Sequence, residues 1–251
     1  MVDGLPVLVE GERIRYSRQL IIDGFGEEAQ RRLKGAKVAV VGVGGLGSPA
    51  ITYLTLAGVG QITIIDPDPV DFTNLNRQWL HWEKDESHPK VCSAREKLKQ
   101  MNGHVKIEVQ QESLDHKNAD WLLKGAEVVL DCLDNWQARM ELNDHCVRTM
   151  TPLVHGAVEG MRGQLTTVVP GRTPCLRCLL ERVPEKGGAM PILGAVAGMG
   201  GSIQASEAIK VLTGLGDPLL GRMLLFDLGA MEFELVELER KRGCPSCGDI
   251  Q

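Results

Sequence analysis

The chain lacks an apolar run of the roughly 18 residues that a membrane-spanning helix needs. It also lacks excess positive charge, since the net charge is −5 and the pI is about 5.7. A nucleic-acid-binding protein needs a basic face to neutralise phosphates. The segment Met1–Glu12 has neither the basic start nor the apolar stretch of a signal peptide. These absences predict a cytoplasmic protein that binds neither membranes nor nucleic acid.

Disulfides are not expected, because thiols stay reduced in the cytosol and the seven cysteines then favour metal binding. Four of them form two Cys-x-x-Cys pairs, Cys175 with Cys178 and Cys244 with Cys247. Each pair alone is ambiguous. Together they supply the four thiolates of a tetrahedral structural site, which predicts one bound Zn²⁺ in preference to a redox role.

The first part of the chain alternates between short buried strands and helices, after a helical preface at 13–34. With 43% apolar residues in 251, a sizeable core is expected. The expected strands are 37–41, 61–65, 105–109, 127–130 and 153–154, and the expected helices are 48–57, 90–101, 119–124 and 136–149. This alternation predicts an α/β fold with a doubly wound, mostly parallel, Rossmann-like sheet.

The pattern changes after about residue 155, where strands at 163–169, 223–227 and 232–235 are of an antiparallel style. One helix, at 202–212, lies between them and stops at Gly214. No internal repeat or low-complexity stretch is present. We therefore expect a single domain over 1–251, with a nucleotide-binding half at 35–155 and a second site, with the zinc, at 156–251.

A glycine-rich loop links the first strand to its helix. Gly42, Gly44 and Gly47 satisfy the G-x-G-x-x-G pattern, and the next strand ends at Asp66. Backbone amides at a helix N-terminus bind phosphate, and a carboxylate at the end of the second strand binds ribose hydroxyls. By itself this motif fits NAD or FAD as well as ATP.

Cationic and amide side chains after Asp66 favour ATP, whose third phosphate needs more positive charge. Arg77 stands among Asn74, Asn76 and Gln78. Lys90 opens a helix, where a cation is disfavoured by about 0.3–1 kcal/mol. An anion bound there explains the lysine, although a solvated surface lysine remains the alternative.

Two carboxylates follow a later strand, Asp131 and Asp134. Side chains at the carboxyl end of a parallel strand lie over the ligand crevice, so either can hold Mg²⁺ against phosphates. The alternative for Asp134 or Asn135 is to cap the following helix. None of the six histidines shows a catalytic pairing, and each is expected to be a surface or core residue. His155 is the best placed of them for the alternative of lining the pocket.

Several motifs occur together in one order. They are Arg15 to Gln19, Gly42 to Ser48, Asp66, Asn74 to Gln78, Pro89 to Val91, Asp131 to Asn135, Pro174 to Cys178 and Gly243 to Gly248. In this combination the chain resembles, over residues 14–248, the MoeB/ThiF/HesA family of bacterial relatives of ubiquitin-activating enzymes.

The resemblance implies an ATP-dependent adenylyltransferase that activates a carboxylate and releases pyrophosphate. The usual substrate is the C-terminal glycine of a ubiquitin-like sulfur-carrier protein, as in molybdopterin or thiamine biosynthesis, which residues 156–251 would bind. It also implies a homodimer in which Arg18 reaches the partner's ATP site. The residues implied to contact MgATP are Gly45, Asp66, Asn74, Arg77, Lys90, Asp134 and Asn135.

One departure from the family concerns the loop before the 202–212 helix. Relatives that link covalently to their carrier keep a cysteine there, whereas the segment 181–194 has none. Cys92, Cys132 and Cys146 are expected to be small apolar residues rather than nucleophiles. We therefore expect the adenylate to be released or handed on, and a small carboxylic acid remains an alternative substrate. Two further alternatives are an NAD-dependent oxidoreductase with an accessory zinc and a non-catalytic scaffold.

Overall fold

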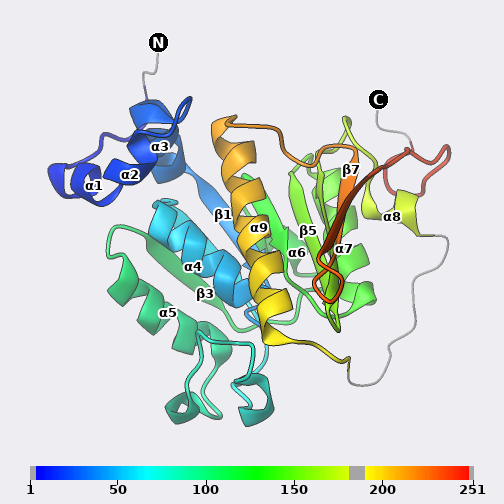
Figure 1. Cartoon of the computed structure of the whole chain (residues 1–251), viewed down its shortest axis with the longest axis horizontal. Coiled ribbons are helices and arrows are strands. Elements are labelled where there is room, and N and C mark those ends of the chain that lie inside the picture. The colour runs from blue at the N-terminus through cyan, green and yellow to red at the C-terminus, as the bar shows by residue number, and fades with distance from the viewer. Residues whose placement is uncertain (1–3, 181–189, 249–251) are drawn as a thin grey trace.

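An eight-stranded sheet runs through the protein, seen in a computed structural model that describes residues 4–180 and 190–248 (Figure 1). The strand order is β3-β2-β1-β4-β5-β6-β7-β8. Neighbours from β3 to β5 are parallel and those from β5 to β8 are antiparallel. The predicted fold class is therefore confirmed. The strands are β1 (Lys37–Val41), β2 (Gln61–Ile65), β3 (Lys106–Gln110), β4 (Val128–Asp131), β5 (Leu153–Glu159), β6 (Arg162–Val168), β7 (Arg222–Asp227) and β8 (Glu232–Glu237).

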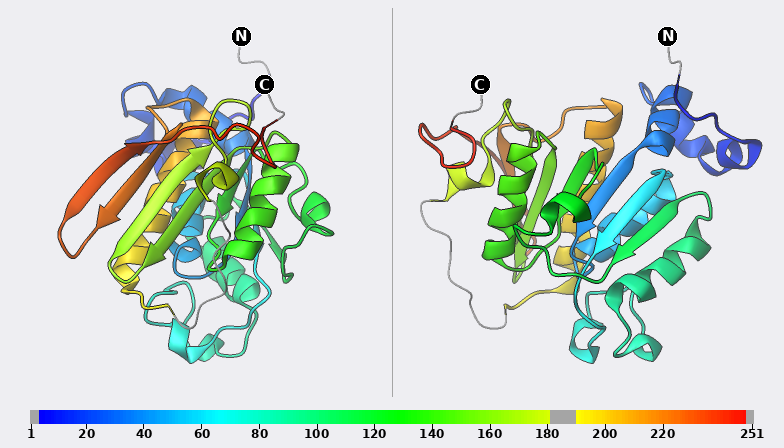
Figure 2. Two further views of the ribbon diagram at one scale, coloured as in Figure 1. Left: turned by 90° about the vertical axis from the view of Figure 1, so that its right-hand side faces the viewer. Right: turned by 180° about the vertical axis from the view of Figure 1, so that it is seen from behind.

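Helices cover both faces of the parallel strands. They are α1 (Glu10–Arg15), α2 (Ser17–Leu20), α3 (Gly26–Gly35), α4 (Gly47–Ala57), α5 (Lys90–Met101), α6 (Ala119–Leu122), α7 (Trp136–Arg148), α8 (Leu176–Leu179) and α9 (Gly194–Thr213), with 3₁₀ turns η1 (Phe72–Asn74) and η2 (Glu83–Asp85). Val38 and Val40 pack with α3, α4, α5 and α9, whereas Ala39 and Val41 pack with α6 and α7 (Figures 1 and 2). No helix in 4–180 or 190–248 is long and apolar enough to cross a membrane.

Two helical predictions differ from the structure by more than two residues, and both segments contain glycines. The preface predicted at 13–34 is divided into three helices. Helix α1 ends at Arg15, before Tyr16, and Gly24 and Gly26, with positive φ angles of 78° and 61°, lie between α2 and α3. Helix α9 begins at Gly194 and not at residue 202. Its glycines serve packing against α4, since a Cβ at Gly201 would lie 2.1 Å from the carbonyl oxygen of Leu46.

The sheet has a topological switch point between β1 and β4. The chain leaves β1 through α4 toward β2 on one side, and β4 lies on the other side of β1. Ligands of open α/β sheets bind at the carboxyl ends of the strands beside such a point. The glycine loop and the segment 132–135 both lie there.

Candidate active site

A groove of about 2050 Å³ opens at the carboxyl ends of the parallel strands and continues along the antiparallel strands. It brings together residues that the sequence placed in one nucleotide site. Those that line it are Gly42, Gly44, Gly45, Asp66, Asn74, Arg77, Lys90, Asp134 and Asn135. Gly47 and Arg18 are not among the lining residues.

The glycine loop needs its glycines for close backbone contacts. Gly42 has a φ of 99°, and a Cβ there would lie 2.4 Å from the carbonyl oxygen of Cys132. A Cβ at Gly47 would lie 2.0 Å from the carbonyl oxygen of Gly42. Gly47 therefore closes the turn, while Gly44 and Gly45 border the groove before α4.

Asp66 ties this loop to the segment after β2. Its Oδ2 accepts the N–H of Val43 at 2.8 Å, and its Oδ1 accepts the N–H of Asp68 at 2.9 Å. Burial raises the pKa of Asp66, opposed by the nearby Lys90 charge and the two backbone N–H groups. A carboxylate oxygen has a second lone pair, so each oxygen keeps acceptor capacity toward the groove.

Amide side chains orient Arg77 toward the same groove. Its Nη2 donates to Asn74 Oδ1 at 2.7 Å, and its Nη1 donates to Asn76 Oδ1 at 2.9 Å. Gln78 also donates to Asn74 Oδ1, at 3.2 Å, and its own Oε1 is buried without a partner in the described part of the chain. Asn74 thus holds the guanidinium, which no carboxylate neutralises in residues 4–180 and 190–248.

Lys90 is 5% exposed, so the alternative of a solvated surface lysine is wrong. Its Nζ lies 3.1 Å from Asp68 Oδ2, and Asp68 is largely exposed. Lysine is seldom buried unless it is paired. The structure therefore places a buried ammonium group at the wall of the groove, at the first turn of α5.

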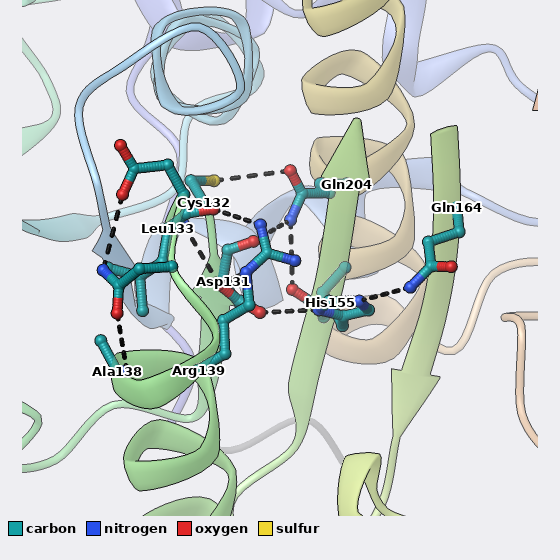
Figure 3. Close-up of polar contacts among 11 residues, drawn as sticks. Asp131, Cys132, Leu133, Ala138, Arg139, His155, Gln164 and Gln204 are labelled. Carbon is teal, nitrogen blue, oxygen red and sulfur yellow. Dashed lines mark hydrogen bonds and ion pairs between the residues drawn. The ribbon is translucent and has the colours of Figure 1, made fainter. Parts of the chain in front are cut away.

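The two carboxylates after β4 have different surroundings, and Figure 3 shows those of Asp131. Asp131 is fully buried, lies 2.6 Å from His155 Nδ1 and does not line the groove. Asp134 is exposed and lines it, and its Oδ1 contacts only Asn135, at 3.5 Å. Asn135 caps α7 by accepting the N–H of Ala138 at 2.9 Å. Of the two acids, Asp134 therefore has oxygens available for a cation.

His155 does not line the groove, so the core position expected for it is confirmed and the pocket alternative is wrong. Its side chain is wholly buried between β4 and β6. Burial lowers the pKa of His155, although Asp131 opposes the shift. The histidine is therefore neutral at physiological pH and belongs to the core.

The four paired cysteines converge on one point, with all four Sγ atoms within 4.8 Å of one another. Cys175 lies 3.6 Å from Cys244, Cys178 lies 3.4 Å from Cys247, and Cys175 lies 4.0 Å from Cys178. A tetrahedral centre with Zn–S bonds of about 2.3 Å separates its sulfurs by about 3.8 Å. The cluster therefore fits a zinc ion.

The three other cysteines have no such grouping. Cys146 is wholly buried in α7 and Cys92 is half-buried in α5. Cys132 lines the groove, where its Sγ donates to Gln204 Oε1 at 3.5 Å, and burial raises its pKa well above the usual range. Most of the cysteine-free segment before α9 falls on 181–189, outside the described residues.

Arg18 lies far from the groove of its own chain. The neighbouring Gln19 donates to the carbonyl oxygen of Ala57, at the C-terminus of α4. The glycine loop precedes the other end of this 11-residue helix, about 16 Å away. Arg18 is exposed and has no hydrogen bond or ion pair within residues 4–180 and 190–248.

Sequence motifs did not identify the far wall of the groove, which the antiparallel strands build. The lining residues there include Glu159, Arg162, Gln164, Phe226, Asp227, Glu232, Phe233 and Glu234. They come from strands that share no local signature. The alternation of Glu232 to Leu235 marked only a half-exposed strand, without showing that it borders the nucleotide loop.

Comparison with known proteins identifies relatives along almost the whole chain. HesA (heterocyst) of Trichormus variabilis is 42% identical over 243 residues, which cover 96% of this chain and 91% of the relative. The SAMP-activating enzyme E1 of Haloferax volcanii is 42% identical over 240 residues, 94% of this chain and 88% of the relative. The adenylyltransferase and sulfurtransferase MOCS3 of Drosophila persimilis is 42% identical, over 96% of this chain and 54% of its own length.

A solved structure has the same fold. MccB of E. coli, determined with ATP, superposes with a TM-score of 0.85 at 23% identity, over 93% of this chain and 73% of MccB. The model of the ThiF family matches residues 16–246. Together with the relatives, this match confirms the resemblance seen in the motifs and does not support the oxidoreductase and scaffold alternatives. The chain belongs to the ThiF family, and it is an ATP-using adenylyltransferase of the E1-like type.

Proposed function

We propose that this protein adenylates the C-terminal glycine of a ubiquitin-like sulfur-carrier protein. The observation that carries the proposal is the size and continuity of the groove. Its volume of about 2050 Å³ exceeds the roughly 300–1,000 Å³ of an ordinary small-molecule site. A nucleotide at the glycine loop leaves a large part of the groove for a second, extended substrate.

The groove has the dimensions of an extended peptide tail. It reaches from Gly42, after β1, to Phe233 and Glu234 of β8, which is five strands away in the sheet. Strands are about 4.8 Å apart, so the span is about 24 Å. An extended chain of about seven residues covers that distance. Asp227 of this wall is paired with Arg162 at 2.7 Å. The other acids there, Glu159, Glu232 and Glu234, make the wall unfavourable for a small anionic substrate.

The residues at the carboxyl ends of β1, β2 and β4 would hold the nucleotide. Gly44 and Gly45 offer backbone N–H groups to the phosphates, and Asp66 accepts ribose hydroxyls. Arg77 and Lys90 neutralise phosphate oxygens. Asp134 would hold Mg²⁺, which, when bound, neutralises charge on the phosphates.

The chemistry follows from charge. A carboxylate oxygen of the carrier attacks the α-phosphorus of ATP, and pyrophosphate leaves. Both reactants are anions, so fixed cations at the groove lower the barrier by reducing their repulsion and stabilising the leaving group. No general base is needed, because the nucleophile is already ionised. This agrees with the lining of the groove, which includes no histidine among the residues that the structure describes.

The adenylate is proposed to be handed on, without a covalent link to this chain. Among the described cysteines, Cys132 alone lines the groove. Its raised pKa keeps it a thiol, which is a poor nucleophile. A sulfur nucleophile from outside this chain therefore attacks the carbonyl carbon of the acyl adenylate, and AMP leaves.

ATP–pyrophosphate exchange tests the function directly. We expect exchange only when a carrier protein ending in Gly-Gly is added, and none with small carboxylic acids or with a carrier lacking its last glycine. MgATP should also raise the melting temperature, because a ligand that binds only the folded state stabilises it, whereas NAD should not. Exchange stimulated by a small acid and not by any carrier would instead favour the alternative substrate class.

We further propose a homodimer in which Arg18 completes the partner's site. Large apolar side chains are exposed around the exposed Arg18, and a second copy would cover them. They are Ile14 in α1, Ile21 and Ile22 directly after α2, and Tyr53 and Leu56 on α4. Such a patch marks an interface in many proteins.

Mixing two inactive variants tests this sharing. In a dimer of Arg18→Ala with Asp134→Ala, one of the two sites has both residues intact. Random mixing is therefore expected to restore about a quarter of the wild-type exchange rate. Light scattering confirms the dimer, and mixed Arg13→Ala and Asp134→Ala proteins give the control. Inactive mixtures that demonstrably contain mixed dimers would show that each site uses its own arginine or none.

A further inference from the structure

A buried polar cluster lies directly beneath the loop that carries Asp134 (Figure 3). It consists of Asp131 at the end of β4, Arg139 of α7 and His155 of β5, with Gln204 of α9 beside them. Asp131, His155 and Gln204 are wholly buried, and Arg139 is 5% exposed. None of these side chains has a part in the proposed chemistry.

Proton positions in the cluster follow from its partners. His155 Nδ1 lies 2.6 Å from Asp131 Oδ2, and a carboxylate only accepts, so Nδ1 carries the proton. On the other side, Gln164 Nε2 donates to His155 Nε2 at 3.4 Å. The neutral histidine thereby fixes one oxygen of Asp131. The other oxygen, Oδ1, accepts the N–H of Leu133 at 3.1 Å.

Arg139 binds the other backbone group of Leu133, its carbonyl oxygen. Its Nη2 donates to the carbonyl oxygen of Leu133, and its Nε lies 3.9 Å from Asp131 Oδ1. The N–H and the C=O of Leu133 are thus both bound by buried side chains of opposite charge. Asp134 is the next residue, and the one after it is fixed as the cap of α7.

Stability alone does not account for this cluster. A buried ion pair is often no more stable than apolar side chains of similar volume. Hydrogen bonds that fix a backbone, in contrast, set the direction of the side chain that follows. Residues behind a metal ligand commonly act in this way, and their loss weakens metal binding.

We propose that Arg139 and Asp131, held by His155, are positioning residues that fix the Leu133 backbone and so direct the Asp134 carboxylate at the magnesium of MgATP. This inference rests on the magnesium role proposed for Asp134. Arg139 also borders the groove, and its Nη1 is buried without a partner in the described part of the chain. A direct contact of this group with the nucleotide would show as a loss of ATP affinity without Mg²⁺ in Arg139→Lys, whereas a positioning role leaves that affinity unchanged.

Calorimetric titration of ATP with and without Mg²⁺ tests the inference in Arg139→Lys, which keeps the charge but loses the planar fork. We expect the Mg²⁺-dependent gain in ATP affinity to fall by about 10- to 100-fold. ATP affinity without Mg²⁺ should be unchanged. Amide hydrogen exchange at Leu133 and Asp134 should accelerate. Arg148→Lys, on the exposed side of the same helix, is the matched control and should resemble the wild type.

Two substitutions of His155 avoid any change of charge. His155→Asn retains a donor for Asp131 and should keep most of the Mg²⁺-dependent gain, whereas His155→Leu should lose it. Equal binding by these two variants, or a full gain in a folded Arg139→Lys protein, would overturn the inference.

Asp134→Asn shows how much of the Mg²⁺-dependent gain in ATP affinity depends on the Asp134 carboxylate. It also distinguishes a failure of the positioning inference from a failure of the magnesium role. If it loses the Mg²⁺-dependent gain while Arg139→Lys keeps it, the positioning inference is wrong and the proposed function stands. If Asp134→Asn keeps the gain, the magnesium role of Asp134 fails, and the inference fails with it. Absence of ATP binding by the wild type would contradict the proposed function itself.

Discussion

Cys178→Ser is expected to release the metal and to lower the free energy of unfolding by several kcal/mol, with a melting temperature lower by about 10 °C. A four-thiolate zinc site contributes about 10–16 kcal/mol of apparent binding free energy, which the folded state gains. Here the metal would join α8 to the segment after β8. Cys175, Cys244 and Cys247 are also buried in the hydrophobic cluster that contains residues of α7, and Cys178 is half-buried.

Metal analysis and urea unfolding of the purified variants give the measurement. Cys92→Ser is the matched control, because it makes the same substitution at a half-buried cysteine outside the cluster. It should keep one zinc per chain and wild-type stability to within about 1 kcal/mol. Freshly purified wild-type protein without zinc, or a Cys178→Ser protein of full stability, would show that the cluster is not a structural metal site.

The loss of zinc should also alter the groove and lower the exchange activity. Arg177, between two of the cysteines, lines the groove and pairs with Asp144 of α7 at 2.6 Å. Ser246, between the other two, donates to the same carboxylate. The cluster thus supports the helix whose N-terminal cap, Asn135, follows Asp134. Lower exchange activity in Cys178→Ser is therefore expected as a secondary effect, and only the metal content and stability test the site itself.

Local signals were sufficient to predict the nucleotide-binding half of the fold. Buried runs of Val and Ile end at a glycine loop or an acid, and the strands predicted at 37–41 and 61–65 have those bounds in the structure. The helix predicted at 90–101 does too. The start of α9 was missed because Gly194 to Gly201 have low helix propensity, which close packing on α4 overrides.

The candidate site was predictable where single strands end, and less so where several elements meet. Parallel strands end at one edge of the sheet, so Asp66, Lys90 and Asp134 were expected near each other. The strand pattern left both Asp131 and Asp134 open as magnesium ligands, and only the family resemblance selected Asp134. The difference between the two acids depends on Arg139 and His155, which come from other elements. For His155 the sequence did not show which side of the strand its side chain occupies. Adjacent positions of a strand face opposite sides, and the His155 side chain lies on the core side.

Lys90→Met is expected to slow ATP–pyrophosphate exchange by about 10²–10³-fold. The ammonium group of Lys90 is buried at the groove wall, where a charge interacts more strongly than in water. Its loss removes a cation that would stabilise the leaving pyrophosphate. It also leaves Asp66 and Asp68 without the neighbouring positive charge, so that two carboxylates face an anionic substrate.

Exchange rates of Lys90→Met and Lys99→Met, compared at saturating ATP, separate this role from a general effect of charge. Lys99 lies in the same helix and is exposed, so its variant should exchange at nearly the wild-type rate. Lys90→Arg should be intermediate, because it keeps the charge but is too bulky for the buried position. If Lys90→Met lost only ATP affinity and kept its maximal rate, the lysine would bind the ground state and transition state equally, and its proposed role in stabilising the leaving group would be wrong.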